Sequence, residues 1–73
     1  MTTLNEVPIG ETVTISKVNA EGSLRRRIMD MGLTKGCVVE VRKVAPLGDP
    51  IEICLRGYEL SIRTSEAEAI DVE

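Results

Sequence analysis

Two thiols, Cys37 and Cys54, are the most reactive side chains of this 73-residue chain. Histidine is absent, which removes the commonest general base and the commonest transition-metal ligand. Cys54 has carboxylates on either side of it in the sequence, Glu52 and Glu59, so these three residues are candidates for a metal site. Structural zinc sites normally take four ligands, mainly Cys and His, and the chain cannot supply that set. We expect no dedicated metal or cofactor site, and the alternative is weak transition-metal binding at Cys54.

The chain carries no recognisable catalytic or nucleotide-binding motif. Its glycines are scattered, and none precedes a Lys-Ser or Lys-Thr pair as a phosphate-binding loop requires. Ser23 and Ser61 have no base positioned by a known signature, so we expect a helix cap and an outward-facing strand residue, respectively. These observations predict a binding protein rather than an enzyme.

Other partner classes are disfavoured by composition. Tyr58 is the only aromatic residue, whereas single-stranded nucleic acids and proline-rich peptides bind to aromatic platforms or grooves. A net charge of −3 also opposes binding to phosphate backbones. No apolar run approaches the ~18 residues that cross a bilayer, and residues 1–10 lack the features of a signal peptide. Two cysteines are too few to staple a small secreted domain. We therefore expect a cytoplasmic protein without a nucleic-acid partner or membrane insertion.

Arg25, Arg26 and Arg27 follow the expected start of a helix. Cations at the positive end of the helix dipole destabilise the first turn by a few tenths of a kcal/mol up to ~1 kcal/mol each. One interpretation is a solvated face on which Arg27 covers the rim of the core. The other is that Arg25 and Arg26 meet acidic groups on another protein.

The loop at residues 45–50 is the second feature that favours a partner. Pro46 and Pro50 stiffen it, and Asp49 before a proline is biased to extended geometry. Leu47 either tucks under the barrel end as a plug or stands out as an apolar anchor, and a stiff loop loses little entropy on binding. The candidate partner-binding residues are Arg25, Arg26, Met29, Leu47 and Asp49.

Charge is distributed unevenly along the chain. Residues 24–43 hold six basic and two acidic residues, a balance of +4, whereas residues 44–73 hold two basic and seven acidic residues, a balance of −5. This polarity suits electrostatic orientation against a protein partner. Weak self-association stays open as well.

One short helix is predicted at about residues 23–31. Ser23 is placed to cap it, and Leu24, Ile28 and Met31 form an apolar stripe. Gly32 sits where a left-handed residue ends a helix, with an apolar residue after it.

The rest of the pattern predicts short strands. Residues 12–18 form a strand that bulges near Ser16 and Lys17, residues 37–44 form another, and a last one lies near 69–72. Residues 51–55 and 58–63 form a hairpin with Arg56 and Gly57 in the turn. The expected cross-strand pairs are Leu55 with Tyr58, Ile53 with Leu60, and Ile51 with Ile62. Cys37 should be buried and Cys54 the more exposed thiol. We predict one mainly β domain over residues 1–73, a small closed or partly closed barrel.

An ordered set of residues over nearly the whole chain resembles the FeoA family of ferrous iron transport proteins. The markers are Leu4, Gly10, residues 24–33 (LRRRIMDMGL), Gly36, residues 45–51 (APLGDPI), Arg56, Gly57, Tyr58, Leu60, Ile62, Arg63, Glu66 and Ala67. The resemblance implies an SH3-like barrel with an inserted helix. It also implies a cytosolic accessory of FeoB, a membrane protein with a GTP-hydrolysing domain that brings Fe²⁺ into the cell. Proteins of this kind bind the cytoplasmic part of FeoB and regulate or assemble it.

Two alternatives stay open at this stage. The same barrel type forms the C-terminal domain of metal-dependent repressors, so the chain could be a metal-linked regulatory module. It could also be a carrier that itself binds Fe²⁺ through Cys54 and neighbouring carboxylates.

Overall fold

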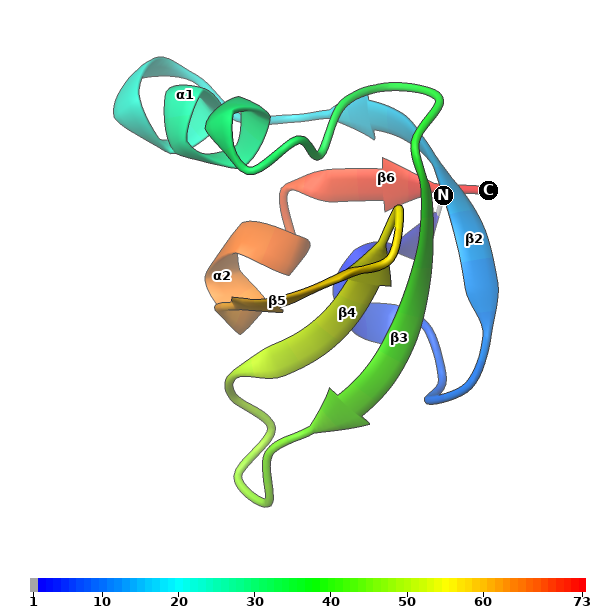
Figure 1. The fold of residues 1–73 in the computed structure, drawn as a ribbon. Coiled ribbons are helices and arrows are strands. Elements are labelled where there is room, and N and C mark those ends of the chain that lie inside the picture. The colour runs from blue at the N-terminus through cyan, green and yellow to red at the C-terminus, as the bar shows by residue number, and fades with distance from the viewer. Residues whose placement is uncertain (1) are drawn as a thin grey trace.

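The computed structural model describes residues 2–73 and shows one antiparallel sheet that curls on itself, with α1 at one end (Figure 1). The six strands lie in the order β1-β6-β2-β3-β4-β5. The elements in chain order are β1 (Thr2–Thr3), the 3-10 helix η1 (Leu4–Glu6), β2 (Thr12–Val18), α1 (Gly22–Asp30), β3 (Val38–Val44), β4 (Ile51–Leu55), β5 (Tyr58–Ile62), α2 (Thr64–Ala67) and β6 (Ile70–Val72). The mainly β class with a short inserted helix is confirmed.

The predicted bulge in β2 is where the sheet changes partners. Ile15 pairs with Val72 but Lys17 pairs with Asp71, so Ser16 is the extra residue. The first half of β2 pairs with β3 and its second half with β6. A bulge bends a strand and increases its twist, which allows one strand to serve both parts of the curl.

The β4–β5 hairpin has the predicted register in all three apolar pairs. Its turn places both central residues in the left-handed region, Arg56 at φ 51° and Gly57 at φ 84°. Such values are needed for a two-residue turn that matches strand twist, and they are uncommon for a residue other than glycine. The apolar pairing between the strands therefore determines the turn. Among the paired residues of the hairpin, Ile51 and Ile62 are buried, whereas Tyr58, next to the turn, is exposed.

Helix α1 differs from the prediction at its start and on its apolar stripe. It begins at Gly22, with no side-chain capping hydrogen bond, so Ser23 lies inside the helix and is not its cap. Ile28 is the buried residue of α1, and Met31 is half-buried against the core. Leu24 is exposed instead, so the apolar stripe does not continue into the first turn of the helix.

The end of α1 is the predicted one. Gly32 has φ 90°, its N–H donates to Met29 O (2.9 Å), and the N–H of Leu33 donates to Ile28 O (3.3 Å). These two bonds satisfy carbonyls that the helix end leaves free, and Leu33 is fully buried.

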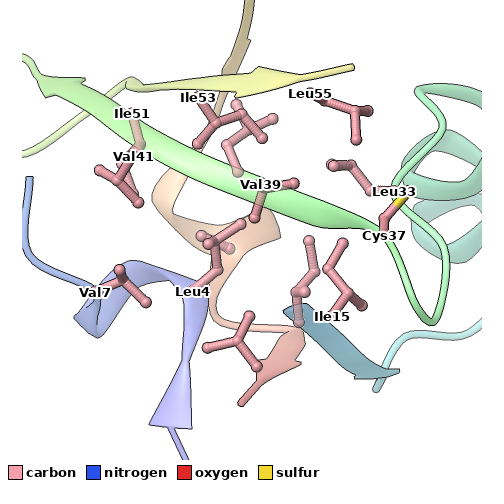
Figure 2. Close-up of a cluster of buried hydrophobic side chains, with 14 of the residues drawn as sticks. Leu4, Val7, Ile15, Leu33, Cys37, Val39, Val41, Ile51, Ile53 and Leu55 are labelled. Carbon is pink, nitrogen blue, oxygen red and sulfur yellow. The ribbon is translucent and has the colours of Figure 1, made fainter. Parts of the chain in front are cut away.

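The core lies inside the curl, where side chains of η1, β2, β3 and β4 converge (Figure 2). As predicted, Cys37 is buried and Cys54 is more exposed. The short elements β1, η1 and α2 were not predicted, although Leu4 of η1 and Ala67 of α2 are fully buried. In η1, the N–H of Thr3 donates to Oε1 of Glu6 (3.1 Å), and this hydrogen bond lowers the pKa of the Glu6 carboxyl group.

Replacing Ile28 with alanine tests whether one buried side chain attaches α1. We expect Ile28→Ala to lower the free energy of unfolding by about 2–4 kcal/mol, because it leaves a cavity that the short helix cannot refill. Urea denaturation followed by circular dichroism measures this change. Leu47→Ala, at an exposed site, is the control and should stay within about 0.5 kcal/mol of the wild type. Equal stability of both variants would contradict the packing described.

Candidate partner-docking surface

Arg27 is a mostly exposed side chain whose guanidinium forms an ion pair with a buried carboxylate of α2. Its Nε lies 2.8 Å from Oε2 of Glu66, whose side chain is only 5% exposed. The other carboxylate oxygen, Oε1, accepts the backbone N–H of Arg63 (2.8 Å) just before α2. The bulk of the Arg27 side chain stays in solvent, so Arg27 spans the rim of the core, as the first interpretation of the arginine run expects.

Arg25 and Arg26 are both exposed on α1, and within residues 2–73 neither forms an ion pair. Arg25 is nevertheless oriented, because its Nη1 donates to the carbonyl oxygen of Val18 in β2 (3.2 Å). Met29 is exposed one turn further along the helix. These three candidate residues are therefore accessible to a partner.

Leu47 stands out from the molecule with 96% of its side chain exposed. The alternative in which it plugs the barrel end is wrong. Leu47 occupies a tight turn closed by a 2.7 Å hydrogen bond from Gly48 N to Ala45 O. The N–H of Ala45 also donates to Pro50 O (3.0 Å), which closes the base of the loop.

The start of α2 braces this loop. Asp49 Oδ1 accepts the N–H of Thr64 (2.8 Å), and the hydroxyl of Thr64 donates to Gly48 O (2.7 Å). Asp49 Oδ2 lies 3.6 Å from Nη1 of Arg63. The Asp49 carboxylate thus binds within the chain and helps to hold Leu47 in its exposed position.

The candidate residues fall into two groups rather than one patch. Helix α1 lies at one end of the molecule and the β3–β4 loop at the other, with α2 between them (Figure 1). Through Glu66, α2 contacts α1, and through Thr64 it contacts the loop. Helix α2 could not be predicted from a capping residue, because Arg63 stands at its N-cap instead of serine, threonine or aspartate.

The thiols lie in different surroundings. Cys54 pairs across the sheet with Glu40 on one side and Glu59 on the other. Glu40 contacts Arg42 (3.1 Å), and this hydrogen bond raises the pKa of the Arg42 guanidinium. Glu52 pairs with Lys43 and Ser61 instead of facing Cys54 directly. Among the described residues, no three His, Cys, Asp or Glu side chains are grouped to hold a metal ion.

Cys37 is enclosed by polar partners. Burial acts to raise the pKa of its thiol, but hydrogen bonds from Thr34 and the nearby charge of Arg56 outweigh burial, so the net effect lowers that pKa. The sulfur lies 3.1 Å from Gly32 O and 3.6 Å from Nη2 of Arg56. The contact with Arg56 connects the β4–β5 turn to the end of α1.

Comparison with known proteins identifies the family. Residues 2–73 match the model described as the FeoA domain. A curated relative from Porphyromonas gingivalis, named an Fe(2+) transport protein A/Fe(2+) transporter FeoB fusion protein, is 36% identical over 70 residues. That match covers 96% of this chain but only 8% of the relative. No helix in residues 2–73 has the length and apolar character needed to cross a membrane.

Two solved structures support the same family and fold. A FeoA-like protein from Clostridium acetobutylicum superimposes with a TM-score of 0.90 at 47% identity, covering 100% of this chain and 88% of that one. The FeoA of Stenotrophomonas maltophilia, complexed with zinc and described as a prokaryotic SH3 domain protein, gives a TM-score of 0.86 at 26% identity. It covers 100% of this chain and 91% of that one. The expected SH3-like fold is confirmed.

Glu66→Gln tests the contact between the two helices. The amide cannot pair with the charge of Arg27, so we expect the free energy of unfolding to fall by about 1–3 kcal/mol. The estimate is below that for a fully buried pair because Arg27 is largely solvated. The matched control is Glu68→Gln, because Glu68 is exposed and directly follows α2. It should change the free energy of unfolding by less than about 0.5 kcal/mol. Equal urea midpoints for the two variants would show that the contact contributes nothing.

Proposed function

Because this chain belongs to the FeoA domain family, we propose that it is a non-catalytic cytoplasmic accessory of Fe²⁺ uptake that binds the membrane transporter FeoB and regulates or assembles it. The observation that carries this proposal is the fusion protein of Porphyromonas gingivalis, in which the matching segment shares a chain with FeoB. A covalent link keeps two modules at high effective concentration. Where the two modules are separate chains, the same proximity must come from an interface between them.

The braced loop supplies such an interface. An apolar anchor gives affinity when its geometry is set before binding, because little entropy is lost on association. Leu47 meets this condition, since its turn is closed at both ends and tied to α2 by Thr64 and Asp49. Exposing so large an apolar side chain brings the isolated fold no packing. We propose that Leu47 enters an apolar pocket on the cytoplasmic part of FeoB.

Catalysis is assigned to the partner. The chain has no histidine and no phosphate-binding loop. The thiol of Cys37 is buried and makes hydrogen-bond contacts with Gly32, Thr34 and Arg56. A docking role uses what the chain does have, a stiff scaffold that presents one apolar side chain and several free cations.

Leu47→Asp tests the proposed anchor. We expect at least a tenfold loss of affinity for full-length FeoB of the same organism, reconstituted in nanodiscs, because a desolvated carboxylate would enter an apolar pocket. Biolayer interferometry with the immobilised chain measures the dissociation constant. The control is Ile9→Asp, since Ile9 is another exposed apolar residue, 61% accessible, on a different loop. Wild-type affinity in folded Leu47→Asp would remove the loop from the interface.

The same variants separate regulation from assembly. If the chain regulates FeoB, adding the wild type changes the rate of GTP hydrolysis and Leu47→Asp does not. If it assembles FeoB, the wild type instead changes the size of the FeoB complex in mass photometry. Both roles would be contradicted if the wild-type chain binds FeoB tightly but changes neither the rate of GTP hydrolysis nor the size of the complex.

A further inference from the structure

A cationic hollow lies between α1, the bulged end of β2 and the turn that follows α1. Its volume is about 350 Å³, at the small end of the range for ligand pockets. The six residues that line it are Ser16, Lys17, Val18, Arg25, Met29 and Lys35. Figure 1 shows α1 and the end of β2 side by side at the same end of the molecule.

The hollow is lined by cations and by no acidic side chain, although Asp71 lies opposite Lys17 in the β2–β6 ladder and accepts a hydrogen bond from Asn19. Lys17, Arg25 and Lys35 come from three different segments, and no acidic residue lines the hollow with them. Within residues 2–73, none of the three forms an ion pair. Gathering like charges on a concave surface is unfavourable in the free protein, and an incoming anionic group relieves it.

The hollow is also partly preorganised. The hydrogen bond to Val18 O fixes Arg25 while leaving its other N–H groups free to bind a carboxylate. Ser16, the extra residue of the β2 bulge, has a buried hydroxyl oxygen without a hydrogen-bond partner.

Met29 adds an apolar surface beside these charges. Its side chain is 37% exposed, and methionine adapts its shape to different apolar partners. The combination of three cations with one thioether therefore matches a segment in which acidic residues flank an apolar one.

We propose that this hollow binds an acidic peptide segment of the partner protein, with its carboxylates on Lys17, Arg25 and Lys35 and an apolar side chain on Met29. The inference rests on the proposed function, because the segment would belong to FeoB. An anionic membrane surface fits less well. Polybasic membrane-binding segments use roughly 4–8 cations, whereas this hollow has three. Residues 44–73 also carry a balance of −5, from two basic and seven acidic residues, which a lipid surface would repel.

The test is a titration of the ¹⁵N-labelled full chain with a synthetic pentapeptide, a leucine flanked by two glutamates on each side. We expect saturable NMR shifts at the amides of Lys17, Arg25 and Lys35, and none with the peptide in which glutamines replace the glutamates. Lys35→Glu should weaken binding at least fivefold, and Lys17→Glu provides a second, independent reversal. Lys43→Glu is the matched control, since it changes the charge equally at an exposed lysine outside the hollow.

Four results would overturn the proposal. The first three are the absence of saturable binding, shifts centred elsewhere, and an equal loss for Lys35→Glu and Lys43→Glu. The fourth is binding to phosphatidylserine vesicles that Lys35→Glu abolishes while the peptide does not bind, which would assign the hollow to lipid. Because FeoB is absent from this titration, its failure leaves the Leu47 experiment unaffected. Conversely, wild-type FeoB binding by Leu47→Asp would not alter the peptide result.

Discussion

A single carboxylate, that of Glu66, connects the two helices that lie outside the sheet. One oxygen binds Arg27 of α1 at 2.8 Å, and the other accepts the N–H of Arg63 at 2.8 Å, where α2 begins. The carboxylate is almost fully buried, so both contacts form in surroundings where charge-assisted hydrogen bonds are strong. The position of α2 in turn sets the position of the β3–β4 loop, through Thr64 and Asp49. The Glu66 carboxylate thus links the two exposed groups at opposite ends of the molecule through α2.

The small core explains why such polar braces matter. A domain of this size buries only roughly 60% of the surface of its unfolded chain, so few apolar contacts are left for peripheral elements. Helix α1 has one buried side chain, Ile28, and a short isolated helix is marginal in water. Its attachment depends on that side chain, on the glycine-terminated end at Gly32 and on Arg27. Arg25 adds one hydrogen bond to Val18 O. Within residues 2–73 neither Arg25 nor Arg26 forms an ion pair, so both can bind an acidic group.

Much of the fold could be predicted because β4 alternates strictly and the pattern of β2 breaks at one point. The pairs of the β4–β5 hairpin follow from the apolar face alone, and the bulge at Ser16 follows from the break in the β2 pattern. The exposure of Leu24 could not be predicted in this way, because an apolar stripe does not reveal which of its members the rest of the fold covers.

The candidate docking residues could be selected from the sequence, but their arrangement could not. Residue types identified Leu47 and Arg25, since an apolar residue in a proline-rich loop and a cation at a helix start are each unfavourable for the fold alone. The grouping of Arg25 with Lys17 and Lys35 depends on the β2 bulge and on the turn after α1, which bring these positions together in space. Their spacing in the sequence does not predict this grouping. The brace through Asp49 was equally hidden, because its partner Thr64 lies 15 residues away in a helix without a standard cap.

The pairing of β1 with β6 has a topological consequence. Thr2 lies opposite Val72 in that ladder, so the polypeptide enters and leaves the barrel at neighbouring points, on the side of the molecule away from α2 (Figure 1). Adjacent ends of this kind allow a domain to be spliced into a longer polypeptide without rearranging its interior. The same barrel can therefore work as a free-standing chain or as a tethered module.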